Sequence, residues 1–271
     1  MILYPPAKIN LGLNILLKRD DGYHEIETCM VPIPFYDILE ITKSDAFEFI
    51  QSGLQIPGEP GTNLCEKAFR KIQDLYLISN VRIHLRKQIP MGAGLGGGSS
   101  DAAYVLKGLN DFFDLKIDEK TLENLAAELG SDCPFFIKNQ AQIAKGRGEF
   151  LKEIPIELSG KYLILLNPGI HVGTKEAYEG VIPSFPDNNL ENVISSPISG
   201  WQSSLKNQFE NHIFIKYPKI AELKQLLIDM GAVYASMSGS GSSLFGIFDE
   251  KPHSIHSQVI ENMVFEGGLS L

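Results

Sequence analysis

Residues 90–100 read PMGAGLGGGSS, and this glycine-rich stretch decides how the rest of the chain is interpreted. Five glycines lie within the seven positions from residue 92 to residue 98. Each glycine weakens a helix or strand by roughly 0.5–1 kcal/mol and adds no side chain to a core, so regular structure does not explain the run. Glycines do let backbone N–H groups approach a bulky, electron-rich ligand. We expect a helix to begin near Ser99, and its unpaired N–H groups would favour a diphosphate or triphosphate.

We therefore predict that the whole stretch binds nucleotide phosphates. Its residues are Pro90, Met91, Gly92, Ala93, Gly94, Leu95, Gly96, Gly97, Gly98, Ser99 and Ser100. Two common phosphate-binding patterns fit poorly. A Walker loop needs lysine after the last glycine, where Ser99 stands. Gly92, Gly94 and Gly97 match the dinucleotide fingerprint, but the preceding strand is not continuously apolar, and two helices follow where that fold needs a second strand. A tight turn without any ligand is the remaining alternative.

The segment before the glycine run alternates like a strand with one buried face. Its apolar positions are Val81, Ile83, Leu85 and Ile89. Its basic residues are Arg82, His84, Arg86 and Lys87. We interpret these basic residues as a solvated strand face rather than a binding patch.

The N-terminal part is predicted to be rich in strands. Residues 9–17 alternate between faces, so Lys8 and Asn10 project together on one side. Asp21 and Gly22 supply a turn, and residues 23–31 return as the partner strand of a hairpin. Residues 37–42 and 47–51 have the pattern of two further strands, and residues 63–77 that of a helix with Asn63 as its N-cap.

Helices are predicted to follow the glycine run. Residues 102–113 and 118–130 show helical spacing, and Ser131 with Asp132 has the position of an N-cap for a third helix, with Pro134 in its first turn. Beyond a proline-bearing, charged segment near residue 155, we expect strands at residues 162–166, 233–237 and 244–248, a helix at 218–230 and a final helix. Residues 188–204 are interpreted as surface loop or short helix. This mixture predicts an α+β fold.

Composition excludes several classes of protein. The formal net charge of −9 argues against nucleic acid as a partner. No apolar run approaches the roughly 20 residues that a membrane helix needs, and no signal peptide is recognisable, so we expect no membrane association and a cytoplasmic location. The three cysteines have no Cys-x-x-Cys spacing, which fits a reducing compartment. His253 and His256 lack further ligands nearby, so a metal site there is a weak prediction.

Three stretches together resemble the galactokinase, homoserine kinase, mevalonate kinase and phosphomevalonate kinase (GHMP kinase) superfamily. They are the segment around Lys8 and Asn10, residues 90–103, and residues 238–246, which read SGSGSSLFG. Their order and spacing match over essentially the whole chain. The resemblance implies a two-domain GHMP-kinase-like fold, with an N-terminal part like domain 2 of ribosomal protein S5 and a ferredoxin-like C-terminal part. We expect residues 1–155 to form the β-rich domain with the phosphate loop, and residues 156–271 to form an α+β domain that completes the substrate cleft.

One branch of the superfamily is most similar. The discriminating segments are residues 21–24 (DGYH), 90–92 (PMG) and 130–134 (GSDCP). That resemblance implies an ATP-dependent kinase that phosphorylates the 2-hydroxyl group of a cytidine-diphosphate-linked methylerythritol in the non-mevalonate route to isoprenoid precursors. It also implies ATP and Mg²⁺ as cofactors and a small-molecule substrate with a cytidine diphosphate group. Ala93 stands where a glycine is frequent and Cys133 where a valine is frequent, and neither change removes a chemical group.

The resemblance also implies roles for single residues. Asp132 would accept the proton of the attacking hydroxyl group, and Lys8 would pair with Asp132 and neutralise charge on the transferring group. From the residues alone, Asp132 is a helix cap and Lys8 an exposed strand lysine. The substrate residues would be Asn10, Tyr23, His24 and Tyr178. A histidine can hydrogen-bond the edge of cytosine, and tyrosine rings can cover its faces.

Other functions remain open from the sequence. The nearest is a GHMP-type kinase for homoserine, mevalonate or a sugar. A dinucleotide-dependent oxidoreductase is more remote, because the context of its fingerprint fails here. A non-catalytic nucleotide sensor is also more remote, because a sensor needs neither Lys8 nor Asp132. The metal ligands are unknown at this level, and the protein is expected to be a monomer or a homodimer.

Overall fold

The computed structural model describes residues 1–56, 58–59 and 61–270. Contacts between Cα atoms divide the chain into two compact units. Unit 1 comprises Met1–Lys8, Phe35–Met91 and Gly96–Gln140, and unit 2 comprises Ile9–Pro34, Gly92–Leu95 and Ala141–Leu271. Each unit is discontinuous in the sequence, whereas the expected domain boundary is a single cut after residue 155, which stays a prediction. Both units mix helices with sheets, which confirms the α+β class.

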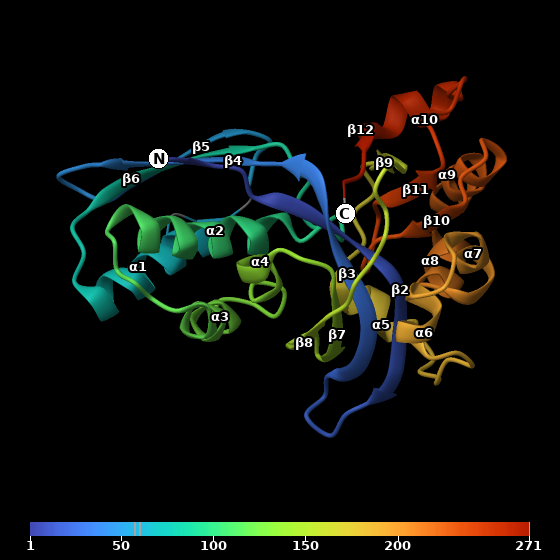
Figure 1. The fold of residues 1–271 in the computed structure, drawn as a ribbon, viewed down its shortest axis with the longest axis horizontal. Coiled ribbons are helices and arrows are strands. Elements are labelled where there is room, and N and C mark those ends of the chain that lie inside the picture. The colour runs from blue at the N-terminus through green and yellow to red at the C-terminus, as the bar shows by residue number, and fades with distance from the viewer. Residues whose placement is uncertain (57, 60, 271) are drawn as a thin grey trace. The chain divides into compact units, whose positions relative to one another are not determined.

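Unit 1 is built on a four-stranded sheet of order β1-β4-β6-β5. Its strands are β1 (Ile2–Leu3), β4 (Ile38–Lys43), β5 (Glu48–Gly53) and β6 (Val81–Lys87). The helices are α1 (Leu64–Tyr76), α2 (Gly97–Phe112), α3 (Glu119–Ala127) and α4 (Phe135–Lys138). Helices α1 and α2 lie together on one face of the sheet (Figure 1). The predicted N-cap Asn63 is confirmed, because its side chain accepts a hydrogen bond from the N–H group of Cys65. Asp118 caps α3 in the same way, through the N–H group of Thr121.

Strand β6 corrects one prediction about its charged residues. Along Val81–Lys87, buried and more exposed residues alternate from the first residue to the last. Arg82 and Arg86 are exposed as predicted, but Lys87 falls on the buried face. The period of two explains this outcome, since Lys87 lies two residues after Leu85 and six after Val81. The interpretation of Lys87 as part of a solvated face is therefore wrong.

Unit 2 holds two four-stranded sheets, of order β2-β3-β7-β8 and β10-β11-β9-β12. The strands of the first sheet, whose outer ends at β2 and β3 belong to unit 1, are β2 (Pro6–Lys18), β3 (His24–Tyr36), β7 (Gln142–Gly146) and β8 (Phe150–Glu153). The strands of the second are β9 (Tyr162–Leu166), β10 (Tyr234–Met237), β11 (Leu244–Phe248) and β12 (Met263–Gly268). The predicted hairpin turn is confirmed, because the N–H group of Tyr23 donates to Oδ1 of Asp21 at 3.0 Å.

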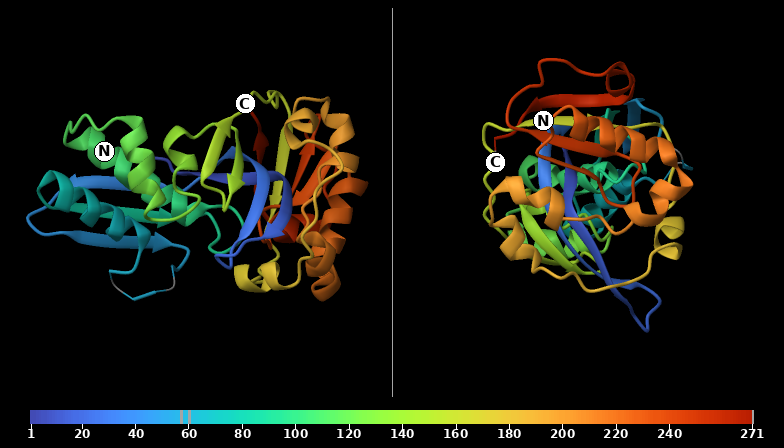
Figure 2. Two further views of the ribbon diagram at one scale, coloured as in Figure 1. Left: turned by 90° about the horizontal axis from the view of Figure 1, so that it is seen from below. Right: turned by 90° about the vertical axis from the view of Figure 1, so that its right-hand side faces the viewer.

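In the described part of the chain, unit 2 contains six α-helices, the longest of which packs against β10 and β11 of the second sheet (Figure 2). They are α5 (Thr174–Glu179), α6 (Leu190–Ile194), α7 (Trp201–Ser204), α8 (Glu210–Lys216), α9 (Pro218–Asp229) and α10 (Ser257–Asn262), with a 3₁₀ turn at Ile198–Gly200. Residues 188–204 contain the short helices that were predicted as one option. Trp201 of α7 is nevertheless buried, at 2% exposure, so this segment contributes to the core. None of the described helices is both long and apolar enough to span a membrane.

Candidate active site

The first turn of α2 forms one side of the candidate site in unit 1. The helix begins at Gly97, two residues before the predicted start, because Gly96 acts as its N-cap with a left-handed φ of 68°. A Cβ atom on Gly96 would lie 2.9 Å from the ring of Phe136 and 3.1 Å from Cγ of Lys8. Glycine is therefore required at the point where the helix starts. The unpaired N–H groups of this first turn are the groups that bind anions.

Lys8 lies against this helix start and forms an ion pair with Asp132. Its Nζ atom is 3.7 Å from Oδ2 of Asp132. The Lys8 side chain is 5% exposed and that of Asp132 is 36% exposed, so the carboxylate is the more accessible group of the pair. Burial lowers the pKa of Lys8, and the attraction of Asp132 opposes that shift.

The loop that holds Asp132 does not have the role of a helix cap. The N-cap of α4 is Pro134, and no side chain caps that helix. The prediction that Ser131 and Asp132 cap it is therefore wrong. Because its carboxylate is not used by the helix, Asp132 keeps an accessible acceptor next to Lys8.

The two serines after the glycines differ in accessibility. Ser99 is partly exposed, and a Cβ atom on Gly130 would lie 4.0 Å from its Oγ atom, which places Ser99 beside the loop of Asp132. Ser100 is fully buried, and its Oγ atom has no hydrogen-bond partner among the described residues. Of the two serines, Ser99 is thus the more accessible to a ligand.

The earlier part of the glycine run packs within unit 2. Gly92 and Gly94 have left-handed φ angles of 61° and 78°. A Cβ atom on Gly94 would lie 1.9 Å from the carbonyl oxygen of Ser238, so no other residue fits at this position. In turn, Oγ of Ser238 donates to the carbonyl oxygen of Gly94 at 2.9 Å. The glycine run and the serine-glycine loop at 238–243, which were singled out separately in the sequence, therefore meet in the fold.

Asn10 joins the same region of unit 2. Its Oδ1 atom accepts a hydrogen bond from Oγ of Ser238 at 3.4 Å, and its Nδ2 atom donates to Oγ1 of Thr28 at 3.1 Å. Asn10 is 3% exposed. Its described contacts orient the serine-glycine loop, and its contact with a substrate stays a prediction.

His24 and Tyr178 lie in direct contact in unit 2, and their roles toward a substrate stay predictions. Their rings stack with centroids 4.9 Å apart and an interplanar angle of 23°. Tyr178 is held from α5 and also meets the ring of Phe209 edge to face. Burial, with a smaller contribution from Lys18, lowers the pKa of His24 and so favours its neutral form. A neutral imidazole offers one donor and one acceptor.

Tyr23 stands apart from that stack in its described contacts. Its side chain is 58% exposed, and the guanidinium group of Arg147 lies over its ring at 4.9 Å from the centroid. Arg147 was not singled out in the sequence. The available ring face of Tyr23 remains a predicted surface for a base.

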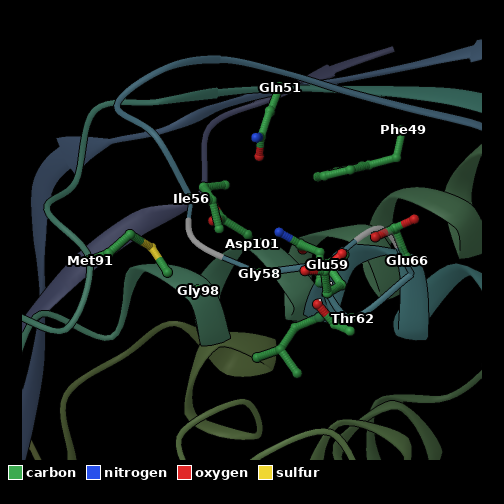
Figure 3. Close-up of a pocket in the computed structure, with 12 residues that line it drawn as sticks. Phe49, Gln51, Ile56, Gly58, Glu59, Thr62, Glu66, Met91, Gly98 and Asp101 are labelled. Carbon is green, nitrogen blue, oxygen red and sulfur yellow. Dashed lines mark hydrogen bonds between the residues drawn. The ribbon is translucent and has the colours of Figure 1, made fainter.

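A pocket of about 350 Å³ lies in unit 1 next to α2, and the sequence did not reveal it. Its lining comes from β5, from the segment before α1 and α1 itself, and from residues near the glycine run. Figure 3 shows Phe49 and Gln51 on one side, with Met91 beside Gly98. Asn63 also lines it, and its Oδ1 atom accepts from the N–H group of Cys65 at 2.8 Å as the cap of α1. That bond fixes the amide and leaves its Nδ2 atom as a donor.

Two models of protein families match this chain, one mostly within unit 1 and one within unit 2. The model of the GHMP kinases N terminal domain matches residues 63–140, and that of the GHMP kinases C terminal domain matches residues 193–264. The first match contains the glycine-run helix, the pocket residue Asn63 and Asp132. Lys8 and the cytosine-ring candidates lie outside both matched ranges.

Individual proteins that are similar to this chain point to one branch of the GHMP kinases. The chain is 49% identical to a 4-diphosphocytidyl-2-C-methyl-D-erythritol kinase of Cytophaga hutchinsonii, over 94% of this chain and 95% of that protein. It is similar to a crystal structure of 4-(cytidine 5'-diphospho)-2C-methyl-D-erythritol kinase, with a TM-score of 0.82 and 33% identity over 96% of this chain and 94% of the other. A homoserine kinase of Cytophaga hutchinsonii has a TM-score of 0.69 at 16% identity, over 96% and 87% of the two chains, which shows a shared fold only.

Proposed function

Because this chain belongs to the GHMP kinases, and among them to the 4-diphosphocytidyl-2-C-methyl-D-erythritol kinases, we propose that it transfers the γ-phosphoryl group of ATP to the 2-hydroxyl group of 4-diphosphocytidyl-2-C-methyl-D-erythritol. The observation that carries the proposal is the corner of unit 1 in which Lys8, Asp132 and the first turn of α2 adjoin. It combines an accessible carboxylate, a buried ammonium group and unpaired N–H groups. Phosphoryl-transfer enzymes use groups of these kinds to position the phosphates, neutralise charge and accept the proton of the attacking hydroxyl group.

Asp132 acts in this proposal as the general base. Its carboxylate accepts the proton of the attacking hydroxyl group as the oxygen bonds to phosphorus. Lys8 holds the carboxylate in place through the ion pair and offers positive charge to the phosphoryl oxygens, where negative charge must be neutralised. Because the ammonium group is buried, its charge is screened little by water.

The N–H groups of residues 96–99 receive the phosphates, and the pocket beside α2 receives adenine. An adenine ring is flat and apolar with a few polar atoms at its edge, which suits a pocket lined by Phe49, Met91 and Asn63. The Nδ2 atom of Asn63 donates to a ring nitrogen of adenine. The hydroxyl group of Ser99 contacts a phosphate oxygen.

Magnesium enters this proposal only with the nucleotide. Among the residues that the structure describes, no group of three His, Cys, Asp or Glu side chains could hold a metal ion. Mg²⁺ in kinases is bound largely by substrate phosphates and water, so it does not need such a cluster. Bound to the phosphates it would neutralise part of their charge, and we assign it no ligand from this chain.

The cytidine group is recognised in unit 2. The neutral ring of His24 hydrogen-bonds the cytosine edge. Tyr23 offers a ring face for stacking, and Tyr178 offers the face that His24 does not cover. The stacked pair of His24 and Tyr178 supports this assignment, because it fixes the orientation of the imidazole. Asn10 orients the nearby serine-glycine loop and contacts the substrate.

A turnover assay tests the proposed function. Purified protein is incubated with ATP, Mg²⁺ and one alcohol at a time, and ADP release is followed. 4-diphosphocytidyl-2-C-methyl-D-erythritol should be phosphorylated, and mevalonate and homoserine should react at least about a thousandfold more slowly in kcat/KM, because they lack the cytidine group. Equal or faster turnover of mevalonate or homoserine would refute the substrate assignment.

A further inference from the structure

Lys87, Asp37 and Asp101 form a buried ionic cluster in unit 1 that the proposed reaction does not use. Lys87 ends β6, Asp37 precedes β4, and Asp101 lies near the start of α2. The Nζ atom of Lys87 donates to Oδ2 of Asp37 and, at 2.7 Å, to Oδ2 of Asp101. The side chains of Lys87, Asp37 and Asp101 are 0%, 0% and 2% exposed. A buried ion pair is weak evidence for stability in itself, so its position calls for another explanation.

The cluster touches the backbone on both sides of the phosphate-binding run. Oδ1 of Asp37 accepts from the N–H groups of Gln88 at 2.6 Å and Ile89 at 2.9 Å, just before the run begins. At the start of α2, a Cβ atom on Gly97 would lie 2.8 Å from Nζ of Lys87. The ammonium group therefore packs directly against the first helical turn. The cluster fixes both the approach to the run and the place where the helix starts.

The charges in the cluster are unequal in number. Two carboxyl groups share one ammonium group, so full ionisation leaves one negative charge without a partner. The Oδ1 atom of Asp101 has no hydrogen-bond partner among the described residues. Asp101 itself is 1% exposed and borders the pocket assigned to adenine.

The charged groups that act on Asp101 are Lys87 from β6 and Asp37 from the segment before β4. On α1, Cys65 interacts with Asp101, and Glu66 interacts with Cys65 and lines the same pocket as Asp101. Burial raises the pKa of the Cys65 thiol well above its ordinary value, so that group stays neutral. The remaining acidic groups would add negative charge beneath the helix start.

We propose that Asp101 is a positioning residue for ATP, which holds the first turn of α2 through Lys87 in its uncharged form, so that nucleotide binding takes up a proton. An ionised Asp101 would set an unbalanced negative charge beside the N–H groups that receive the polyphosphate. The uncharged carboxyl group removes that repulsion and still accepts the hydrogen bond from Lys87. The inference rests on the proposed function only through ATP binding.

The electrostatic setting agrees with this geometry. Burial raises the pKa of Asp101, Asp37 adds to the increase, and Lys87 opposes it. The two carboxyl groups raise the pKa of Lys87 although burial works in the other direction. Because the raised pKa keeps the proton on Asp101 to higher pH than in an exposed aspartate, ATP affinity should fall as pH rises through that pKa.

Calorimetry of a non-hydrolysable ATP analogue tests the inference, in two buffers of different ionisation enthalpy between about pH 6.5 and 9.5. The wild type should take up a fraction of a proton, and its Kd should rise by up to about tenfold per pH unit on the alkaline side. The variant Asp101→Asn keeps an acceptor for Lys87 but cannot titrate, so proton uptake should disappear and its Kd should change much less. In turnover assays the part of the pH dependence that Asp101→Asn removes should lie in KM for ATP and not in kcat.

Controls separate this role from a merely structural one. Asp74→Asn changes an exposed carboxylate on α1 and should behave like the wild type. Equal proton uptake in the wild type and in Asp101→Asn would overturn the inference, even if the variant melted at a lower temperature. If Asp101→Asn does not fold, the ¹³C carboxyl signal of Asp101 in the wild type decides the question. That signal should move toward the protonated position when the analogue binds, and no movement would overturn the inference.

Proton uptake on binding of the ATP analogue can be measured without the acceptor substrate. Proton uptake on ATP binding without phosphorylation of 4-diphosphocytidyl-2-C-methyl-D-erythritol would contradict the proposed function and support the role of Asp101. Phosphorylation of that substrate without proton uptake on ATP binding would support the proposed function and contradict the role of Asp101.

Discussion

Asp132 presents its carboxylate to solvent while the ammonium group beside it is buried, at 36% and 5% exposure. We predict that Asp132→Asn folds normally and binds ATP with unchanged Kd, because neither α4 nor the pocket uses its charge. Its kcat should fall about 10²- to 10⁴-fold, the usual contribution of a general base. Single-turnover kinetics and a thermal melt provide the measurement. A kcat within about threefold of the wild type would remove Asp132 from this role.

Lys8 should titrate at lower pH than an exposed lysine, because burial disfavours its charged form. Asp132 acts in the opposite direction, so removing its charge should lower the pKa of Lys8 further. We predict that Lys8 loses its proton at lower pH in Asp132→Asn than in the wild type. Nitrogen-15 NMR of the lysine Nζ atoms measures this, with Lys8→Arg to assign the signal. An unchanged or higher pKa in the variant would contradict the described ion pair.

The sequence could indicate Lys8 and Asp132 only through their family resemblance. Read locally, residues 131–134 have the composition of a helix N-cap, and the structure shows that the cap lies at Pro134 instead. The prediction for Lys87 was wrong because it relied on the charge of the residue and not on the period of the strand. Its charge suggested a solvated face, but the strand period places it inward, where Asp37 and Asp101 compensate its charge.

At the scale of a single helix, the start of α2 depends on a residue without a side chain. We predict that Gly96→Ala lowers the free energy of unfolding by about 1–2 kcal/mol, because a left-handed backbone is strained for alanine and its Cβ would press on Phe136. ATP binding should weaken as the first turn shifts. Urea unfolding and calorimetry are the measurements.

Gly98→Ala is the matched control for stability. A Cβ atom there would meet only Cε of Met91, at 3.9 Å, and Gly98 lies inside the helix. It should leave the free energy of unfolding unchanged or raise it by about 0.5–1 kcal/mol. If both variants were equally stable, the N-cap of α2 would not need glycine.

Elements with strong periodicity were predictable, and those defined by distant partners were not. Strands β9 and β11 match their predicted residues, since each is a short apolar run bounded by turn residues. Strand β12 was missed, because Met263–Gly268 includes two glycines and owes its conformation to pairing with β9. Strand β7 likewise depends on β3, which lies more than a hundred residues earlier.

Across the whole molecule, each unit should bind its own part of the substrates. We predict that His24→Ala weakens binding of a cytidine nucleotide about tenfold or more and leaves ATP binding unchanged. Asn63→Ser should weaken ATP binding and leave binding of the cytidine nucleotide unchanged, because serine can still cap α1 but lacks the Nδ2 donor. Calorimetry with CDP and with an ATP analogue measures both effects. A variant that weakens both ligands equally would show that the two sites are not separate.

The pocket assigned to adenine could not be predicted from the sequence. It is assembled from β5, α1, α2 and the segments beside them, and none of these has a local pattern that indicates a base. The glycine run, by contrast, lies in one short stretch, and its residue types alone predict a phosphate ligand. The phosphate-binding run could therefore be predicted from the sequence. The pocket could not, because it forms only when distant segments fold together.

A crystal structure with a non-hydrolysable ATP analogue and 4-diphosphocytidyl-2-C-methyl-D-erythritol would place both substrates at once. We expect the β-phosphate against the N–H groups of residues 96–99 and the 2-hydroxyl oxygen within hydrogen-bonding distance of the Asp132 carboxylate. Phosphates bound away from the start of α2, or a 2-hydroxyl group out of reach of Asp132, would contradict it.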